Sequence, residues 1–221
     1  MPHFLLPRET IKEELKMENL LKRYPALSAV KNEIADALEI LKCTYENGGK
    51  LLVCGNGGSA ADCDHIVGEL MKCFKRKRPI KPEFAEKLSA MGEDGEALAS
   101  LLEAGLPAIS LCEHNSLSTA YANDRNPYAV FAQQLSVLGN AGDTLIALTT
   151  SGNSKNCVYA ATVAKAKGMK VISITGMGGG KISALADTAI KLPENETYLI
   201  QELTLPIYHY LCAELEKHFF G

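Results

Sequence analysis

The sequence predicts an α/β fold, a three-layer sandwich in which helices cover both faces of a parallel sheet. Two observations predict it. Short, continuous apolar runs recur along the chain, as expected for strands that are buried on both faces. Turn residues and stretches with helical spacing lie between these runs, and this alternation is typical of parallel sheets covered by helices.

The first part of the chain, residues 1–48, predicts a helical hairpin. Residues 8–24 and 26–46 are rich in Glu, Lys, Leu and Ala at helical spacing. Pro25 separates them, because proline interrupts the hydrogen bonding of a helix. We expect this hairpin to pack against a partner subunit.

Five later segments are predicted as strands, since each is a short apolar run followed by turn residues. They are KLLVCG at 50–55, PAISLC at 107–112, TLIALTT at 144–150, KVISITG at 170–176 and TAIKLP at 188–193. The stretch 79–106 interrupts the alternation with Pro, Gly and acidic residues around two short amphipathic segments. It predicts a helical insertion, for which surface elaboration is favoured over a lid.

The composition is that of an ordinary globular protein. The 221 residues are 47% hydrophobic and 22% charged with a net charge of −3, so we expect a single domain over 1–221 and no nucleic-acid partner. No apolar run suits a signal peptide or a membrane span, which predicts a cytoplasmic protein without a membrane partner. The seven cysteines are scattered without a CxxC pair, which argues against a disulfide framework and a thiolate zinc site.

Two predicted strand ends run into loops rich in Gly, Asn and Ser. The first is CGNGGSAAD at 54–62, where Gly55, Gly57 and Ala60 fit the dinucleotide pattern G-x-G-x-x-A. A dinucleotide fold also needs a second strand that ends in an acidic residue about 20 residues later. That region reads KCFKRKRPIKP, so we predict no nucleotide cofactor.

A sugar phosphate suits these loops better. In the second loop, TTSGNS, hydroxyl groups surround Gly152 where a helix begins, and helix N-termini and hydroxyls both bind phosphate oxygens. The alternative is that these Ser, Thr and Asn residues only cap the helix and form turns. Two such loops at strand ends of one parallel sheet favour phosphate and hydroxyl recognition in a shared crevice.

Four titratable or polar side chains form a second pattern. His65 and Glu69 are spaced i, i+4, so both fall on one face of the helix that follows the first loop. Gln201 and His209 are two turns apart on the last predicted helix, with Pro206 between them. These four could bind a divalent metal or supply an acid and a base, although His and Glu four residues apart also occur as a plain surface pair.

Four motifs together resemble the SIS (sugar isomerase) domain family in its phosphoheptose isomerase form: GNGGSAADCDHIVGEL, TTSGNSKN, SITGMGGGKISALAD and IQELTLPIYHYL. The resemblance runs from about residue 10 to the C-terminus, without 79–106. It implies a flavodoxin-like sheet of five parallel strands and a homotetramer with active sites between subunits. The implied reaction converts sedoheptulose 7-phosphate to D-glycero-D-manno-heptose 7-phosphate through an enediol.

The resemblance also implies roles for individual residues. Glu69 matches the general base and His209 the general acid, and one zinc ion per subunit would be held by His65, Glu69, Gln201 and His209. The predicted sugar-phosphate contacts are Asn56, Gly57, Gly58, Ser59, Asp124, Thr149, Thr150, Ser151, Ser154 and Gln201. Whether Glu69 acts as a free base or as a zinc ligand is open at this point.

Three positions depart from the family pattern. Cys73 stands where an Arg often helps to bind phosphate, Tyr198 stands where an Asp can contact the substrate, and Pro206 is unusual in the last helix. A nearby basic stretch either replaces the lost positive charge or is only a solvated part of the surface. This stretch comprises Lys72, Lys75, Arg76 and Lys77.

These departures keep two other functions open. One is a non-catalytic sugar-phosphate sensor or adaptor of the same fold, including the type that binds the bacterial replication initiator. The other is a related aldose-ketose isomerase or a sugar-phosphate lyase.

Overall fold

The sheet of this protein is all parallel and has the predicted strands. The computed structural model describes residues 16–221, and its five-stranded sheet has the order β2-β1-β3-β4-β5. The strands are β1 (Leu51–Cys54), β2 (Ala108–Ser110), β3 (Thr144–Leu148), β4 (Lys170–Thr175) and β5 (Thr188–Lys191). Each lies inside one of the five predicted segments, so the predicted fold class is confirmed.

The strand order creates a crevice at one edge of the sheet. Leu51 of β1 lies opposite Ala108 of β2 on one side and Thr144 of β3 on the other. The chain therefore moves outward from β1 to β2 and then returns past β1 to β3. The loops that leave β1 and β3 diverge to opposite faces, and ligands bind at such a switch point in open α/β sheets.

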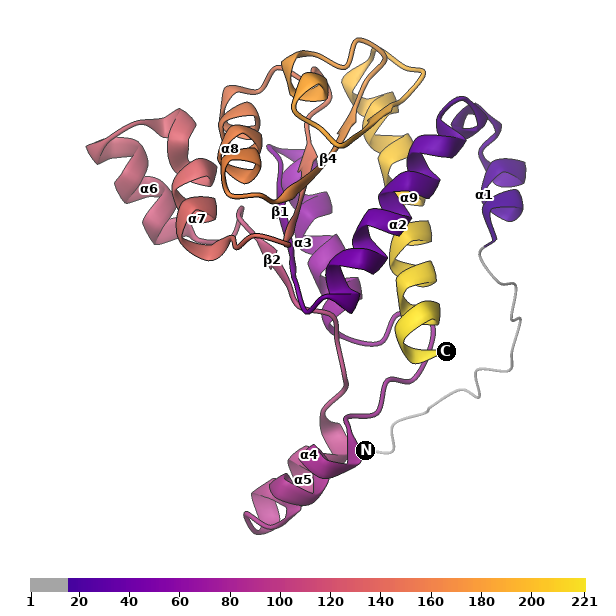
Figure 1. Ribbon diagram of the computed structural model, residues 1–221, viewed down its shortest axis with the longest axis vertical. Coiled ribbons are helices and arrows are strands. Elements are labelled where there is room, and N and C mark those ends of the chain that lie inside the picture. The colour runs from indigo at the N-terminus through magenta and orange to yellow at the C-terminus, as the bar shows by residue number, and fades with distance from the viewer. Residues whose placement is uncertain (1–15) are drawn as a thin grey trace, which may run out of the picture.

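Helices cover both faces of the sheet, as the sequence predicts. One face carries α2 (Lys31–Glu46), α3 (Gly58–Met71) and α9 (Thr197–Phe220), and the other carries α7 (Val130–Leu138) and α8 (Lys155–Ala166) (Figure 1). Alternate residues of β1 serve the two layers: Leu51 and Val53 pack with the first set, Leu52 and Cys54 with the second. The sheet therefore has a hydrophobic core on each of its two faces, and a layer of helices covers each core, which gives the three-layer sandwich.

The second N-terminal helix starts later than predicted. The described part contains α1 (Met17–Arg23) and a 3₁₀ helix η1 (Pro25–Val30) before α2, while residues 8–15 of the predicted helix lie outside the described residues. Proline at position 25 separates the segments as expected. The α-helix starts only at Lys31, because Val30 has non-helical dihedral angles, φ −126° and ψ 22°.

The segment 79–106 forms the two predicted helices, α4 (Pro82–Ser89) and α5 (Glu93–Leu101). They pack against each other and project from the body of the protein (Figure 1). Because the segment leads directly into β2, it leaves the sheet at the amino ends of the strands, away from the two loops. The remaining elements are α6 (Asn115–Asp124) and the 3₁₀ helices η2 (Pro127–Ala129) and η3 (Lys181–Ala184). Within residues 16–221, no helix is both long and apolar enough to cross a bilayer.

Candidate active site

The two polar loops meet at the crevice between β1 and β3. Asn56, which follows β1, donates from Nδ2 to Oδ1 of Asn156 on α8 at 3.1 Å. Asn156 returns the bond to Oδ1 of Asn56 at 2.7 Å. This reciprocal amide pair joins the loop after β1 to the helix that follows β3, so the prediction that both loops face one crevice is confirmed.

Neither helix that begins at the crevice is capped by the side chain of its N-cap residue. Gly57 precedes α3 with φ +58°, and it has no side chain to offer. Ser154 precedes α8 and makes no capping bond; its Oγ instead accepts a hydrogen bond from Thr149 Oγ1 at 3.0 Å. The first N–H groups of a helix attract anions when no side chain satisfies them, which suits the start of α3 for a phosphate group; at the start of α8, Asn156 Oδ1 accepts from the N–H of Cys157 and leaves the earlier N–H groups for a ligand.

The second loop is held in shape by a neighbouring glycine-rich loop. Gly152 has φ +66°, and a Cβ atom there would lie 2.0 Å from the carbonyl oxygen of Gly179. Within the loop, Ser151 Oγ accepts from the backbone N–H of Asn153 at 3.1 Å, which is the turn-forming role that the sequence offered as the alternative. The loop thus combines turn-forming contacts with exposed polar groups.

The predicted acid and base come together on adjoining helices. His65 and Glu69 on α3 are in contact, with 3.1 Å between Nε2 and Oε1. His209 on α9 approaches the same imidazole, with 3.5 Å between the two Nε2 atoms. The i, i+4 spacing therefore places His65 and Glu69 on the face of α3 that meets α9.

Two further residues orient His65. The hydroxyl group of Tyr208 lies 3.1 Å from Asp62 Oδ1 and 3.0 Å from His65 Nδ1. When Tyr208 donates to the carboxylate, its oxygen accepts a hydrogen bond from His65 Nδ1. A proton on Nδ1 leaves the lone pair of His65 Nε2 available to a metal ion, whereas a proton on Nε2 is donated to Glu69 Oε1.

The surroundings of His209 favour its uncharged imidazole. Partial burial and the neighbouring His65 lower the pKa of His209, although Glu69 acts in the opposite direction. Burial raises the pKa of Asp62, against the hydrogen bond from Tyr208 and the charge of His65. Neutral imidazole can serve as a metal ligand or as a hydrogen-bond donor to a carbonyl oxygen.

Only one of the two carboxylate oxygens of Glu69 has a hydrogen-bond partner among the described residues. Its Oε2 atom is buried and has no hydrogen-bond partner in the described part of the chain. Lys72 Nζ lies 3.7 Å away, too far for a hydrogen bond, so this lysine of the basic stretch offsets charge near the carboxylate. A buried acceptor without a partner is costly unless a ligand or an ion completes it.

The donor set of the cluster fits a zinc ion in part. Zinc takes ligands at about 2.0–2.2 Å in a tetrahedron, which places neighbouring donor atoms about 3.4 Å apart. The 3.1 Å and 3.5 Å separations at His65 are close to this value. As they stand, however, the side chains contact one another, and among residues 16–221 no group of three or more His, Cys, Asp or Glu is arranged as a metal site.

Two predicted residues lie apart from this cluster. Gln201 rests against the start of α3, where a Cβ atom on Gly58 would be 2.8 Å from its Nε2. Asp124 ends α6, which packs with η2 and α7 on the opposite face of the sheet from α9 (Figure 1). Its carboxylate accepts from its neighbour Asn123 at 3.0 Å. Within one chain, the fold does not bring Asp124 to Glu69.

The positions that depart from the family pattern do not disrupt the cluster. Pro206 lies buried inside α9, which continues through it from Thr197 to Phe220. Tyr198 is exposed in the first turn of that helix, and the backbone N–H of Cys73 donates to Glu103 at 2.9 Å. Asp62, Tyr208 and Asn156 were not predicted as site residues, although each lies inside a quoted motif, because only their long-range contacts reveal their roles.

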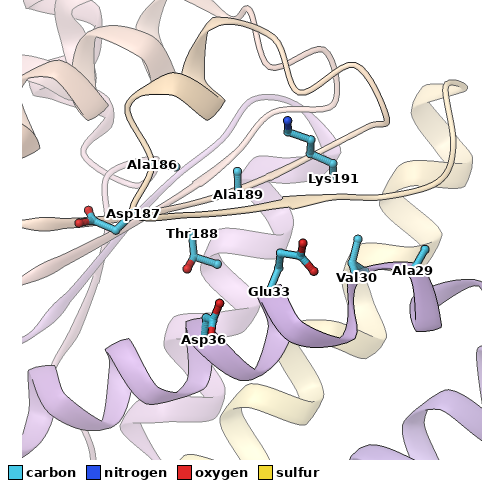
Figure 2. Close-up of a pocket in the computed structure, with 9 residues that line it drawn as sticks. All are labelled: Ala29, Val30, Glu33, Asp36, Ala186, Asp187, Thr188, Ala189 and Lys191. Carbon is cyan, nitrogen blue, oxygen red and sulfur yellow. The ribbon is translucent and has the colours of Figure 1, made fainter.

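A hollow on the surface lies elsewhere and contains none of the predicted site residues. It has a volume of about 440 Å³ and lies between the start of α2 and the edge strand β5 (Figure 2). Glu33 and Asp36 face it from α2, and Asp187 on its other wall is paired with Lys165 and Lys170. The acid-base cluster and the two loops remain the candidate active site.

Known proteins resemble this chain in both sequence and fold. The SIS domain matches residues 16–103 and 93–176. Phosphoheptose isomerase of Helicobacter pylori strain P12 is 38% identical over 208 residues, 94% of each chain. That of Methylibium petroleiphilum is 38% identical over 199 residues, which cover 89% of this chain and 87% of the relative.

Two solved structures have the same architecture at 30% sequence identity. Phosphoheptose isomerase GmhA from Neisseria gonorrhoeae superimposes with a TM-score of 0.71 and covers 91% of this chain and 93% of its own. A phosphoheptose isomerase from Francisella tularensis gives a TM-score of 0.73, with 90% and 94% coverage.

Proposed function

This chain belongs to the SIS domain family, and on that premise we propose that it is a phosphoheptose isomerase. The reaction is the conversion of sedoheptulose 7-phosphate to D-glycero-D-manno-heptose 7-phosphate through an enediol. The observation that carries the proposal is the contact of Glu69 and His209 with one imidazole, His65, on two adjoining helices. Glu69 and His65 lie on α3, the helix that begins at the loop after β1.

The chemistry assigns one task to each member of the pair. Glu69 takes the proton from C1 of the ketose, and His209 gives a proton to the carbonyl oxygen at C2, which yields the enediol. Return of a proton to C2, with removal of the O1 proton, completes the aldose. The Oε2 atom of Glu69, which has no hydrogen-bond partner in the described part of the chain, is the oxygen that would take the proton.

The distance between the loops and the acid-base cluster suits a long sugar phosphate. Gly58 begins α3 beside the loop after β1, and His65 lies seven residues later on that helix. At 1.5 Å per residue, they are separated by roughly 10 Å along the axis. A substrate whose phosphate is bound at the helix starts would thus need an extended carbon chain to reach Glu69.

Zinc, one ion per subunit, is the cofactor that we propose. His65, Glu69 and His209 would hold it, with Gln201 as a fourth ligand after a movement of its side chain from Gly58. A bound zinc ion would polarise the carbonyl oxygen as a Lewis acid. The two oxygens of Glu69 would allow both roles: Oε1, which contacts His65, would bind the ion, and Oε2 would take the substrate proton.

The assembly that we propose is a homotetramer with active sites between subunits. The position of Asp124 supports this assembly. Asp124 lies across the sheet from α9 of its own chain, so it would contribute to the active site of a partner subunit. The proposal places the enzyme in the cytoplasm and includes no nucleic-acid partner, no membrane and no nucleotide cofactor.

A non-catalytic sensor or adaptor is the alternative, and it is not favoured. Binding a sugar phosphate needs the loops but not a carboxylate and an imidazole held together on α3 and α9. The relatives with 38% identity are enzymes by name.

Proton NMR in deuterated water tests the function. We expect the purified protein to convert sedoheptulose 7-phosphate to the aldose with solvent deuterium at C2. Glu69→Gln should lower kcat by about 10²–10⁴, the usual contribution of a general base. Glu39→Gln, at an exposed carboxylate on α2, is the matched control and should keep full activity.

Two results would contradict the proposal. Binding of the sugar phosphate without turnover in zinc-replete protein would make the chain a sensor. Full activity of Glu69→Gln would remove the proposed base. Metal analysis of protein purified without added metal gives the zinc content, which we expect to be one ion per subunit.

A further inference from the structure

A completely buried ion pair lies beside the proposed catalytic residues. Arg78 follows the basic stretch after α3, and Glu216 is on α9; both side chains are 0% exposed. Arg78 Nε donates to Glu216 Oε1 at 2.8 Å. Isolated buried charges are costly, so a pair retained there needs further bonds to both partners.

Arg78 supplies those bonds to the end of α3. Its Nη1 donates to the carbonyl oxygen of Leu70 at 2.7 Å, and Nη2 donates to that of Glu69 at 3.0 Å. Carbonyl groups in the last turn of a helix lack partners within the helix and carry partial negative charge. The guanidinium therefore caps α3 through the backbone of the proposed base itself.

Glu216 binds the chain segment that leaves α3. It accepts from the backbone N–H groups of Phe74 and Lys75, each at 2.8 Å. The ring of Phe74 in turn packs on the imidazole of His209, with 5.5 Å between the ring centroids. Glu216 is also seven residues after His209, two turns along α9 and on the same side of that helix.

We propose that Arg78 and Glu216 are positioning residues that set the distance and orientation between Glu69 on α3 and His209 on α9. The inference rests on the proposed function and assigns no chemistry to the pair. Arg78 also stacks on the ring of Phe220, 5.0 Å from its centroid, so it contacts α9 at two places. A displacement of about 1 Å between reacting groups is enough to slow an enzyme about a hundredfold.

Arg78→Lys is the variant that tests this inference. Lysine keeps the charge, but a single ammonium group cannot bond the two carbonyls and the carboxylate in the planar geometry of a guanidinium. We expect kcat to fall at least about tenfold with KM within about twofold of the wild type, because binding of the phosphate at the loops is unchanged. Zinc affinity, measured separately by competition with a chelator, should weaken about tenfold or more.

The matched control is Lys50→Met, which removes another ion pair, one with no member on α3 or α9. Lys50 Nζ lies 2.6 Å from Asp143 Oδ2 before β1 and β3, and Asp143 keeps two backbone N–H bonds without it. This variant should lose thermal stability yet keep kcat and zinc affinity. Where Arg78→Lys gives no folded protein, Glu216→Gln, which keeps the shape of the side chain, replaces it.

The outcomes separate this inference from the proposed function. Unchanged kcat and zinc affinity in Arg78→Lys, or losses that simply follow the fall in Tm as in Lys50→Met, would overturn the positioning role. An inactive wild-type protein would instead refute the proposed function. The zinc affinities of the wild type and the variants would then be the test of the positioning role. A wild type that neither isomerises the sugar nor binds zinc overturns both.

Discussion

At the scale of single residues, the second loop depends on a glycine at position 152. Its left-handed φ of +66° is strained for residues with a side chain, and the carbonyl of Gly179 occupies the place of a Cβ atom. The sequence identifies this glycine as part of a polar turn. It does not show that the loop at 176–180 lies against Gly152 and so excludes a larger residue there.

Gly152→Ala should therefore reduce stability more than left-handed strain alone requires. We expect a loss of about 1–2 kcal/mol from the backbone and a further loss from the clash. Gly48→Ala is the control, since Gly48 has φ +74° and nothing within 4 Å of the added Cβ. Urea unfolding measures both variants. Equal losses would mean that the loop at 176–180 moves aside without cost.

The acid-base cluster shows what could be predicted from individual residues. The i, i+4 spacing of His65 and Glu69 places them together whatever the rest of the fold does, because helix geometry alone brings such side chains into contact. The approach of His209 and the contacts of Tyr208 with Asp62 link residues far apart in sequence. Spacing along the chain contains no information about such contacts.

At the scale of elements, α4 and α5 form a unit that the rest of the protein barely supports. The structure describes no buried residue in α4, and Gly95 is the buried residue of α5. A Cβ atom on Gly95 would lie 1.8 Å from the carbonyl oxygen of Leu88. The two helices thus depend on one close contact between their backbones.

Gly95→Val should separate α4 from α5 and leave the sheet intact. Valine cannot fit where Leu88 lies, but few contacts transmit the change to the core, so we expect Tm to move by less than about 2 °C. Hydrogen exchange should show lost protection confined to 82–101. Ala97→Val, at an exposed position of α5, is the control. Cooperative loss of protection in the sheet would instead show that the pair supports the core.

At the scale of the whole molecule, the proposed active site is incomplete in one chain. The loops, Glu69 and His209 are arranged around α3, whereas Asp124 is on the other face of the sheet. In the proposed tetramer, a neighbouring subunit would supply this carboxylate. Two inactive variants with changes in different parts of the site can test this idea.

Mixing Asp124→Ala with Glu69→Gln should restore activity. Each variant alone is expected to be inactive, but a hybrid site can take Glu69 from one chain and Asp124 from the other. Random assembly of equal amounts in a closed, symmetric tetramer gives about one quarter of the sites with both wild-type residues. Light scattering checks that the mixture consists of four chains per particle. No recovery after mixing and reassembly would place Asp124 outside a shared site.

The sequence by itself determined the five strands, the helices that alternate with them and the two polar loops at the carboxyl ends of β1 and β3. Hydrophobic periodicity and turn residues are local properties, and they specify which face of an element is buried. They do not specify its partner. Even the start of the second N-terminal helix shifted, because the 3₁₀ turn at 25–30 buries Leu27 and Val30 in the core.

Only the tertiary structure decided which distant groups meet. It places Asn56 against Asn156, Tyr208 between Asp62 and His65, and buries Arg78 with Glu216. Arg78 shows the reason most clearly: it directly follows a basic stretch that is typical of solvated surface, yet it is buried against a carboxylate that lies 138 residues away in sequence. Burial of such a pair removes water from both charges at once. This cost is offset only where the two charges meet, and the whole chain must fold to bring them together.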